Sequence, residues 1–334
     1  NMEPLQNMVS ALCEAAGTWG GESPAAAAAA GFLESAAQVE IDPMGNVVGR
    51  LGKIGAPNRI LLNAHLDQIS MMVTEIDADG FLRIAPCGGI DRRVLPGSPV
   101  TVLGRERLTG VVCGAVYGAD KLPPLEEMAV DPGMTKEQAE LLVSPGDRVV
   151  YSGRPQRLLG SRVTSPSLDD RAGCAAVIRA AQLLAGEDLS WEVIVLLSSR
   201  EETGGPGAGT AAYALDPAQA ICVDVSFAVQ PGLQKGKYAS LGGGPMVGIA
   251  PALSAGMRAD LTRIAKQEGI PYQLEVMGGS TGTDIDHICI ARGGVACAML
   301  SLPQRNMHTP AEIVDLQDLE WTARLMAAYV RGLV

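Results

Sequence analysis

Two apolar runs do most to limit the folds open to this chain. The segments RILLNAHLD (59–67) and WEVIVLLSS (191–199) are apolar over most of their length. A strand with one wet face alternates apolar and polar residues, whereas a strand buried on both faces is apolar throughout. We therefore expect both segments inside a mostly parallel sheet that helices cover on both sides, which is an α/β fold.

Helical and strand patterns alternate through much of the remaining chain. Residues 23–38 predict a helix with Ser23 at its cap and Pro24 in its first turn. Residues 38–52 predict a hairpin that turns at DPMGN. Further helices are expected at 168–185, 256–269 and 284–294 and from about Asp315, and further strands at 220–227, 272–277 and 295–303.

The pattern changes between residues 68 and 164. Short β-type runs there, such as TGVVCGAV (109–116), are separated by Gly, Pro and Asp, as in a small barrel or sandwich. One short helix is expected after Thr135, which has capping-box spacing to Gln138. We therefore predict an α/β domain formed by 1–67 and 165–334, interrupted by an inserted β domain at 68–164.

Charge and cysteine usage exclude some classes of protein. The net charge of −11 argues against a nucleic-acid partner, because binding phosphates requires clustered Lys and Arg. No run of about 18 apolar residues predicts a membrane span, and the first residues lack the pattern of a signal peptide. Seven cysteines without CxxC spacing suggest reduced thiols, so we expect a cytoplasmic protein.

The apolar run at 191–199 is followed by Glu201 and Glu202, then by Gly204 and Gly205. Neighbouring side chains on a continuing strand point to opposite faces, so two adjacent carboxylates converge only where the strand has ended. The glycines permit a sharp turn there. This placement indicates a metal or acid/base site at the carboxyl end of a parallel strand, although an isolated pair of glutamates is more often a solvated loop.

Other polar residues also follow predicted strands. His65 ends the run at 59–67, and Asp67, two positions later, is placed to orient its ring for a metal. Asp224 lies near the end of the strand at 220–227, and His308 follows the strand at 295–303. Because parallel strands end along one edge of a sheet, we expect these side chains to meet.

Asp169 opens a predicted helix that is entered from the same edge, although Asp169 or Asp170 could simply cap that helix. Histidines and carboxylates without cysteine suit divalent cations such as Zn or Co, and Mn is also compatible with these ligands. The set is large enough for two ions that share a bridging carboxylate and activate water. One glutamate would then remain unliganded as a general base.

Two other readings remain open. The segment GGSTG (278–282) matches G-x-S-x-G between a strand and a helix, which would make Ser280 a nucleophile with His308 downstream. No HGGG-type stretch precedes it, and this reading leaves His65, Glu202 and Asp224 unexplained. His287 is expected on a helix face near the rim of the site, with a ligand role as the alternative.

Ordered motifs along nearly the whole chain resemble the M42 family of dinuclear metallo-aminopeptidases, the tetrahedral and glutamyl aminopeptidase group. The motifs are GTWGGE, EIDPMGNVVGR, NAHLD, RRVLPGSPV, SLDDRAG, REETGGPGA, CVDVS, GGSTGTD, RGGV and LPQRNMHTPAE. An older label of some members, endoglucanase, is not favoured by the chemistry of the site.

The resemblance implies a role for each candidate residue. His65 and Asp224 would bind a first metal and Glu202 and His308 a second, with Asp169 bridging the two. Glu201 would be the general base, and Asp67 would polarise the ring of His65.

The resemblance also implies a partner and an assembly. The inserted domain would mediate dimerisation, and dimers would build homo-oligomers, up to dodecamers, whose chamber admits only short peptides. Gln68 and Arg200 depart from the residues common in the family, so substrate preference is left open. A non-catalytic member of the family is a further alternative.

Overall fold

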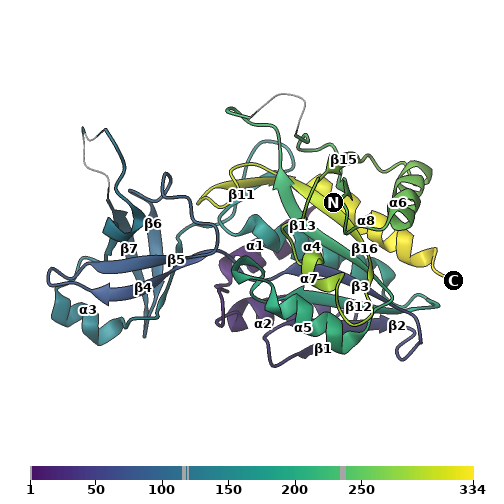
Figure 1. Ribbon diagram of the computed structural model, residues 1–334, viewed down its shortest axis with the longest axis horizontal. Helices are drawn as coiled ribbons and strands as arrows, with labels where there is room; N and C mark the ends of the chain where they lie inside the picture. Colours follow the sequence, from purple (N-terminus) through teal and green to yellow (C-terminus); the bar gives the residue numbers. More distant parts are fainter. Residues whose placement is uncertain (1, 115–117, 119, 234–237) are drawn as a thin grey trace.

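Four parallel strands form the centre of an eight-stranded sheet (Figure 1). The structure, a computed structural model, describes residues 2–114, 118, 120–233 and 238–334. In spatial order the strands are β1 (Gln38–Ile41), β2 (Val47–Gly52), β12 (Glu192–Ser198), β3 (Arg59–His65), β13 (Gln219–Phe227), β16 (Ala296–Gln304), β14 (Met246–Ile249) and β15 (Gln273–Val276).

Both faces of this sheet are covered, as the apolar runs predicted. In β3, Ile60 and Leu62 belong to one core cluster and Leu61 to another on the opposite face. The first cluster contains residues of α1 (Glu3–Glu14), α2 (Ser23–Leu33), α4 (Leu168–Leu184), α6 (Ala255–Gln267) and α8 (Leu316–Arg331). The second contains residues of α5 (Pro206–Leu215) and α7 (Ile285–Ile288). The expected α/β fold is therefore confirmed.

The segment after β3 forms a closed six-stranded barrel with its own apolar core, at one end of the molecule (Figure 1). Its strands are β4 (Ser70–Ile76), β5 (Leu82–Cys87), β6 (Pro99–Leu103), β7 (Arg107–Cys113), β8 (Ala129–Asp131) and β9 (Arg148–Tyr151). The barrel segment also carries η1 (Leu125–Glu127) and α3 (Lys136–Leu142), and Thr135 and Gln138 form the predicted capping box. Residues 115 and 116 of the predicted run at 109–116 lie outside the described residues.

A three-stranded antiparallel sheet follows the barrel in the chain. It pairs β10 (Gln156–Arg157) with β11 (Arg162–Ser165), and β11 with β17 (Glu312–Asp315). Because β11 leads directly into α4 and β17 follows His308, this small sheet brings two separate parts of the chain to the same edge of the main sheet. Neither β10, β11 nor β17 was predicted from the sequence.

Some element boundaries differ from the expectations. The N-cap of α2 is Glu22, without a side-chain hydrogen bond, and Ser23 is the first helical residue. The helix expected at 284–294 is confined to α7, because the chain beyond it contains turns and Gly293 and Gly294. Within the described ranges, no helix combines the length and the apolar character needed to cross a membrane.

Candidate metal centre

The carboxylate of Asp169 lies between the two histidines that the sequence singled out. Its Oδ1 is 3.0 Å from Nε2 of His65, and its Oδ2 is 3.1 Å from Nε2 of His308. His65 is the last residue of β3, whereas His308 follows β16. One carboxylate therefore faces imidazole nitrogens from two strands.

Each histidine has a further carboxylate at its side. Oδ1 of Asp224, in β13, is 3.7 Å from Nε2 of His65, and Oε1 of Glu202 is 3.1 Å from Nε2 of His308. Three groups of potential ligand atoms result within the described residues, and within each group all atoms lie within 4.8 Å of one another: His65–Asp169–Asp224, Asp169–Glu202–His308 and His65–Glu201–Glu202. The first two groups have Asp169 in common.

Glu201 and Glu202 reach this centre because the chain turns sharply after β12. Arg200 has a φ of 61°, and Gly204 and Gly205 have φ values of 106° and 64°, all in the left-handed region. Between them the two glutamates form the 3-10 turn η2 (Glu201–Thr203). Glu201 Oε2 lies 3.9 Å from Nε2 of His65. The turn explains how neighbouring carboxylates approach one centre.

Asp67 holds this turn in place. Its Oδ1 accepts the backbone N–H of Glu201 at 2.8 Å, and its Oδ2 accepts that of Glu202 at 3.2 Å. The ring Nδ1 of His65 lies 3.1 Å from the backbone carbonyl oxygen of Asp67 and 3.6 Å from its carboxylate. The carbonyl therefore orients the ring, while the carboxylate positions the glutamates.

The start of α4 separates the two adjacent aspartates. Asp170 accepts the backbone N–H of Gly173 through Oδ1 at 3.0 Å and that of His65 through Oδ2 at 3.2 Å. A Cβ on Gly173 would lie 2.2 Å from the Asp170 carboxylate, so only glycine fits there. Asp170 therefore caps the regular part of the helix, whereas the carboxylate of Asp169 faces the histidines.

Sequence reasoning missed Glu312, a buried residue of β17. Its Oε2 accepts the backbone N–H of Asp169 at 3.0 Å, and its Oε1 accepts that of His308 at 2.8 Å. Gly89, in the barrel segment after β5, was missed as well, and its carbonyl oxygen lies 2.9 Å from Nδ1 of His308. No strand pattern pointed to either residue.

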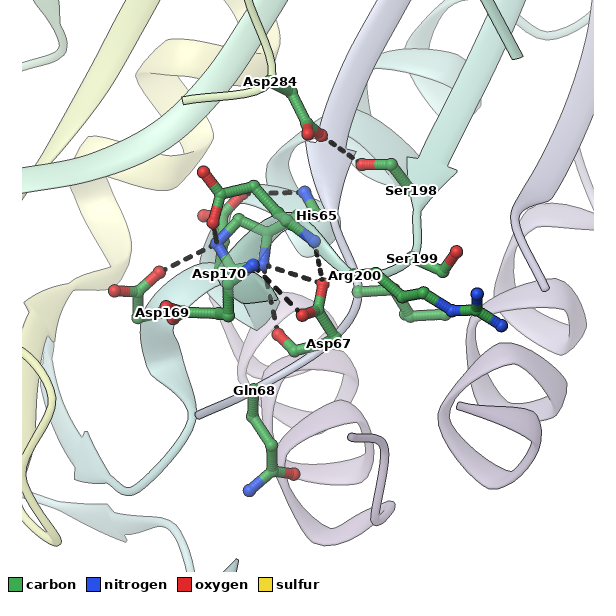
Figure 2. A network of polar contacts seen from close by, with 12 residues as sticks. His65, Asp67, Gln68, Asp169, Asp170, Ser198, Ser199, Arg200 and Asp284 are labelled. Atoms are coloured by element: carbon green, nitrogen blue, oxygen red, sulfur yellow. Dashed lines mark hydrogen bonds and ion pairs between the residues drawn. The ribbon is translucent and has the colours of Figure 1, made fainter. Parts of the chain in front are cut away.

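A buried polar cluster lies beside β3 and β12. Asp284 accepts hydrogen bonds through Oδ2 from Ser198 Oγ and, at 3.3 Å, from Asn63 Nδ2 (Figure 2). Its other oxygen, Oδ1, is buried and has no hydrogen-bond partner in the part of the chain that the structure describes. Burial raises the pKa of Asp284 to about 6 despite the hydrogen bond from Ser198.

The protonation behaviour of the centre reflects crowded negative charge in a buried space. Burial raises the pKa of Asp224 well above its ordinary value and also raises that of Glu202. Burial would lower the pKa of His308, but the carboxylates of Asp169 and Glu202 raise it to about 11. The raised pKa values of the carboxyl groups and of His308 have the same consequence: a positive charge between these side chains would be strongly stabilised.

The donor set fits divalent cations. Oε1 of Glu202 is buried and lies 3.1 Å from Nε2 of His308. Neighbouring ligand atoms of a zinc ion, with metal–ligand distances of about 2.0–2.2 Å, are themselves about 3–3.5 Å apart. The spacing around Asp169 has this size, and all the donors are oxygen and imidazole nitrogen, which Zn, Co and Mn accept.

A cavity of about 210 Å³ opens onto this centre. All the predicted ligands and Glu201 line it, together with Phe227 and Met307 on one side and the segment 281–283 on the other. It is large enough for one amino-acid residue and its scissile bond, but not for a folded chain.

Two candidate residues lie outside the centre. Ser280 is exposed, and none of its contacts in the described structure reaches His308, whose ring faces Gly89, Asp169 and Glu202. The ring of His287 packs against Gly205, where a Cβ would lie 2.3 Å from it. The geometry therefore gives no support to a Ser280–His308 pair or to His287 as a ligand.

Comparisons with known proteins identify the family of this chain. The profile of the M42 glutamyl aminopeptidase family matches residues 45–325. A lysyl aminopeptidase of Pyrococcus furiosus is 34% identical over 317 residues, which is 89% of this chain and 87% of the relative.

Two solved structures share the fold. An aminopeptidase from the archaeon Desulfurococcus kamchatkensis has a TM-score of 0.94 at 32% identity, covering 99% of this chain and 96% of its own. PhTET1-12s, a dodecamer in its asymmetric unit, has a TM-score of 0.88 at 29% identity, covering 98% of this chain and 99% of its own.

Proposed function

The chain belongs to the M42 glutamyl aminopeptidase family and is a peptidase, and from that premise we propose that it releases N-terminal residues from short peptides with two divalent metal ions. The observation that carries the proposal is the pair of ligand groups that share Asp169. His65 and Asp224 would hold one ion, Glu202 and His308 the other, and Asp169 both. Zn or Co is the expected metal, and Mn is compatible.

The ions would supply Lewis-acid chemistry, which lowers the pKa of water and polarises the scissile carbonyl. Glu201 would act as the general base. Its side chain is 14% exposed, and it accepts no hydrogen bond from the described residues, so it is free to meet a water molecule in the cavity. Burial, opposed by His65 and assisted by Asp224, raises the pKa of Glu201 above its ordinary value. A carboxylate next to the cavity can take a proton from water and pass it to the leaving amine.

Glu312 and Asp67 would act as positioning residues. Glu312 accepts backbone N–H groups of Asp169, at the start of α4, and of His308, after β16. Asp67 accepts the backbone N–H groups of Glu201, the proposed base, and of Glu202, a proposed ligand. Ligand supports of this kind restrict the rotamers of the groups that they hold.

The barrel segment at 68–164 would form the dimer contact, and the dimers would assemble into a larger homo-oligomer, such as a dodecamer. PhTET1-12s, which shares the fold over 98% of this chain, supports this part of the proposal. We also place the protein in the cytoplasm, because all seven cysteines are free.

The test is hydrolysis of a panel of aminoacyl-p-nitroanilides by metal-stripped protein, with and without added Zn or Co. Activity that returns only with metal, and that ranks N-terminal side chains, supports the proposal. Activity that survives chelation and is lost with a serine-directed reagent would instead assign the reaction to Ser280. Hydrolysis of no substrate under any condition would favour a non-catalytic role.

A further inference from the structure

A second cavity adjoins the metal centre at Glu202. It measures about 570 Å³ and lies toward the barrel, between Trp19, Gly88 and Arg200. Glu202 lines both cavities, and a Cβ on Gly88 would be 3.4 Å from the side chain of Glu202. The two cavities therefore adjoin each other at the side chain of Glu202.

Arg200 brings a guanidinium group to this cavity. Its Nε is 4.0 Å from Oε1 of Glu22, a distance that allows an ion pair but is longer than a hydrogen bond. Oε1 of Glu22 already accepts the backbone N–H of Gly20 at 3.0 Å, and among the described residues the buried Nε of Arg200 has no hydrogen-bond partner. Figure 2 shows the guanidinium pointing away from the carboxylates around His65. The metal centre therefore does not use this charge.

A second guanidinium, that of Arg148, also lies close to Gly20. Arg148 donates from Nε to the carbonyl oxygen of Trp19 at 3.1 Å, and its Cζ lies 4.8 Å from the centroid of a Trp19 ring. A Cβ on Gly20 would be 3.6 Å from Nη2 of Arg148 and 3.9 Å from Nη2 of Arg200. Two guanidinium groups therefore lie close to Gly20, and that of Arg200 lines the cavity.

The two cavities differ in the groups that line them. The smaller one contains the proposed metal ligands and Glu201. The larger one carries the Arg200 guanidinium, whose planar fork suits a carboxylate. A peptide placed with its N-terminal residue in the smaller cavity would continue past Glu202 toward Arg200.

We propose that the larger cavity binds a carboxylate of the substrate on the leaving side of the scissile bond, with Arg200 as its main partner and Arg148 close behind. This inference rests on the proposed aminopeptidase function. Arg200 and Glu202 are two residues apart, so their Cα atoms are at most about 7 Å from each other. The carboxylate therefore belongs to one of the first residues after the bond that is cleaved.

Two sources can supply this carboxylate. One is the C-terminal carboxylate of a dipeptide or tripeptide, which would make Arg200 a selector for very short peptides. The other is an acidic side chain on the residue after the scissile bond. The Arg200 guanidinium would bind either carboxylate, so each of the two must be tested with its own pair of substrates.

The experiment measures kcat/KM for peptides that begin with the residue ranked highest in the p-nitroanilide panel. One pair is a dipeptide ending in alanine, as free acid and as amide. The other pair is a dipeptide amide ending in aspartate or in asparagine. The metal-loaded protein is compared with Arg200→Asn, Arg200→Lys and the control Arg263→Asn. Asn tolerates the left-handed backbone at position 200, and Arg263 is an exposed residue of α6 that pairs with Asp260.

In one of the two pairs, the ratio of kcat/KM for the substrate with the carboxylate to kcat/KM for the substrate without it should fall about tenfold in Arg200→Asn. A loss of this size is expected when one hydrogen bond to a charged group is removed. The ratio should be partly kept in Arg200→Lys and unchanged in Arg263→Asn. Loss in the acid/amide pair identifies the C-terminal carboxylate, and loss in the aspartate/asparagine pair identifies the side chain. Unchanged ratios in both pairs overturn the inference, while the p-nitroanilide panel still tests the aminopeptidase function separately.

Discussion

The carboxylate of Asp67 accepts the backbone N–H of Glu201 at 2.8 Å and thereby ties the end of β3 to the turn that follows β12. The same carboxylate holds the N–H of Glu202. One side chain thus sets the positions of the proposed base and of a proposed ligand, although it contacts no substrate itself.

Asp67→Asn should lower kcat/KM on the best p-nitroanilide about 10- to 100-fold, because one acceptor oxygen is replaced by an amide that cannot accept an N–H. Metal content, measured by mass spectrometry, should fall less than activity. If the variant keeps more than half of the activity, Asp67 is not needed to position the turn.

Glu201→Gln should keep its metal and lose at least about 100-fold in kcat, because Gln cannot take a proton from water. The matched variant Glu202→Gln should instead lose metal affinity, since a ligand oxygen is replaced. Equilibrium dialysis with Zn or Co, alongside kinetics, separates the two effects. A fully active Glu201→Gln protein would contradict the assigned base.

Removal of metal should lower the melting temperature by several degrees, because an ion that binds only the folded protein stabilises it by mass action. The clustered carboxylates of Asp169, Glu202 and Asp224 would then repel one another without a cation. Scanning calorimetry with chelator and with added Zn measures the shift. The difference in melting temperature between the metal-loaded and metal-free protein should be smaller in His308→Ala. An equal difference in that variant would argue against His308 as a ligand.

Asp318 should make the stability depend on pH away from the metal centre. It is buried in α8, its carboxylate accepts the N–H groups of Gly242 and Gly244 at 2.8 Å, and burial raises its pKa to about 6. A carboxyl group with a raised pKa binds its proton more tightly in the folded state. Its contribution to stability is therefore present below about pH 4 and lost as the pH rises through about 6.

Asp318→Asn cannot titrate, so its free energy of unfolding should fall less between pH 4 and pH 7 than that of the parent protein. The difference should be on the order of 2–3 kcal/mol. Urea unfolding of both proteins with chelator present measures it. Parallel pH profiles would show that Asp318 titrates normally.

The sequence allowed the meeting of the candidate side chains to be predicted because they follow apolar strands. His65, Glu202 and Asp224 each lie at the carboxyl end of a parallel strand, and such ends share one edge of the sheet by geometry alone. Asp169 and Asp170 could not be told apart in the same way, since either fits a helix cap. Only the backbone at the start of α4 assigns one to the cap and the other to the centre.

The supporting residues could not be predicted. Glu312 belongs to a short strand of the small three-stranded sheet, and Gly89 contributes only a backbone carbonyl. Neither has a pattern that periodicity or spacing can detect. The cavity at Arg200 depends on Trp19, Gly88 and Arg148 as well, which are far apart in the chain, so the unusual residue at position 200 had no evident meaning in the sequence.

The hydrogen bond between the ring of His308 and the carbonyl of Gly89 joins the metal centre to the segment that leads through the barrel. If the barrel forms the contact between subunits, its attachment to a neighbour and the orientation of this ring are thermodynamically linked. Metal affinity would then depend on protein concentration, with diluted subunits holding their ions less firmly than assembled ones. Assembly of the subunits would in this way raise the metal affinity on which the reaction depends.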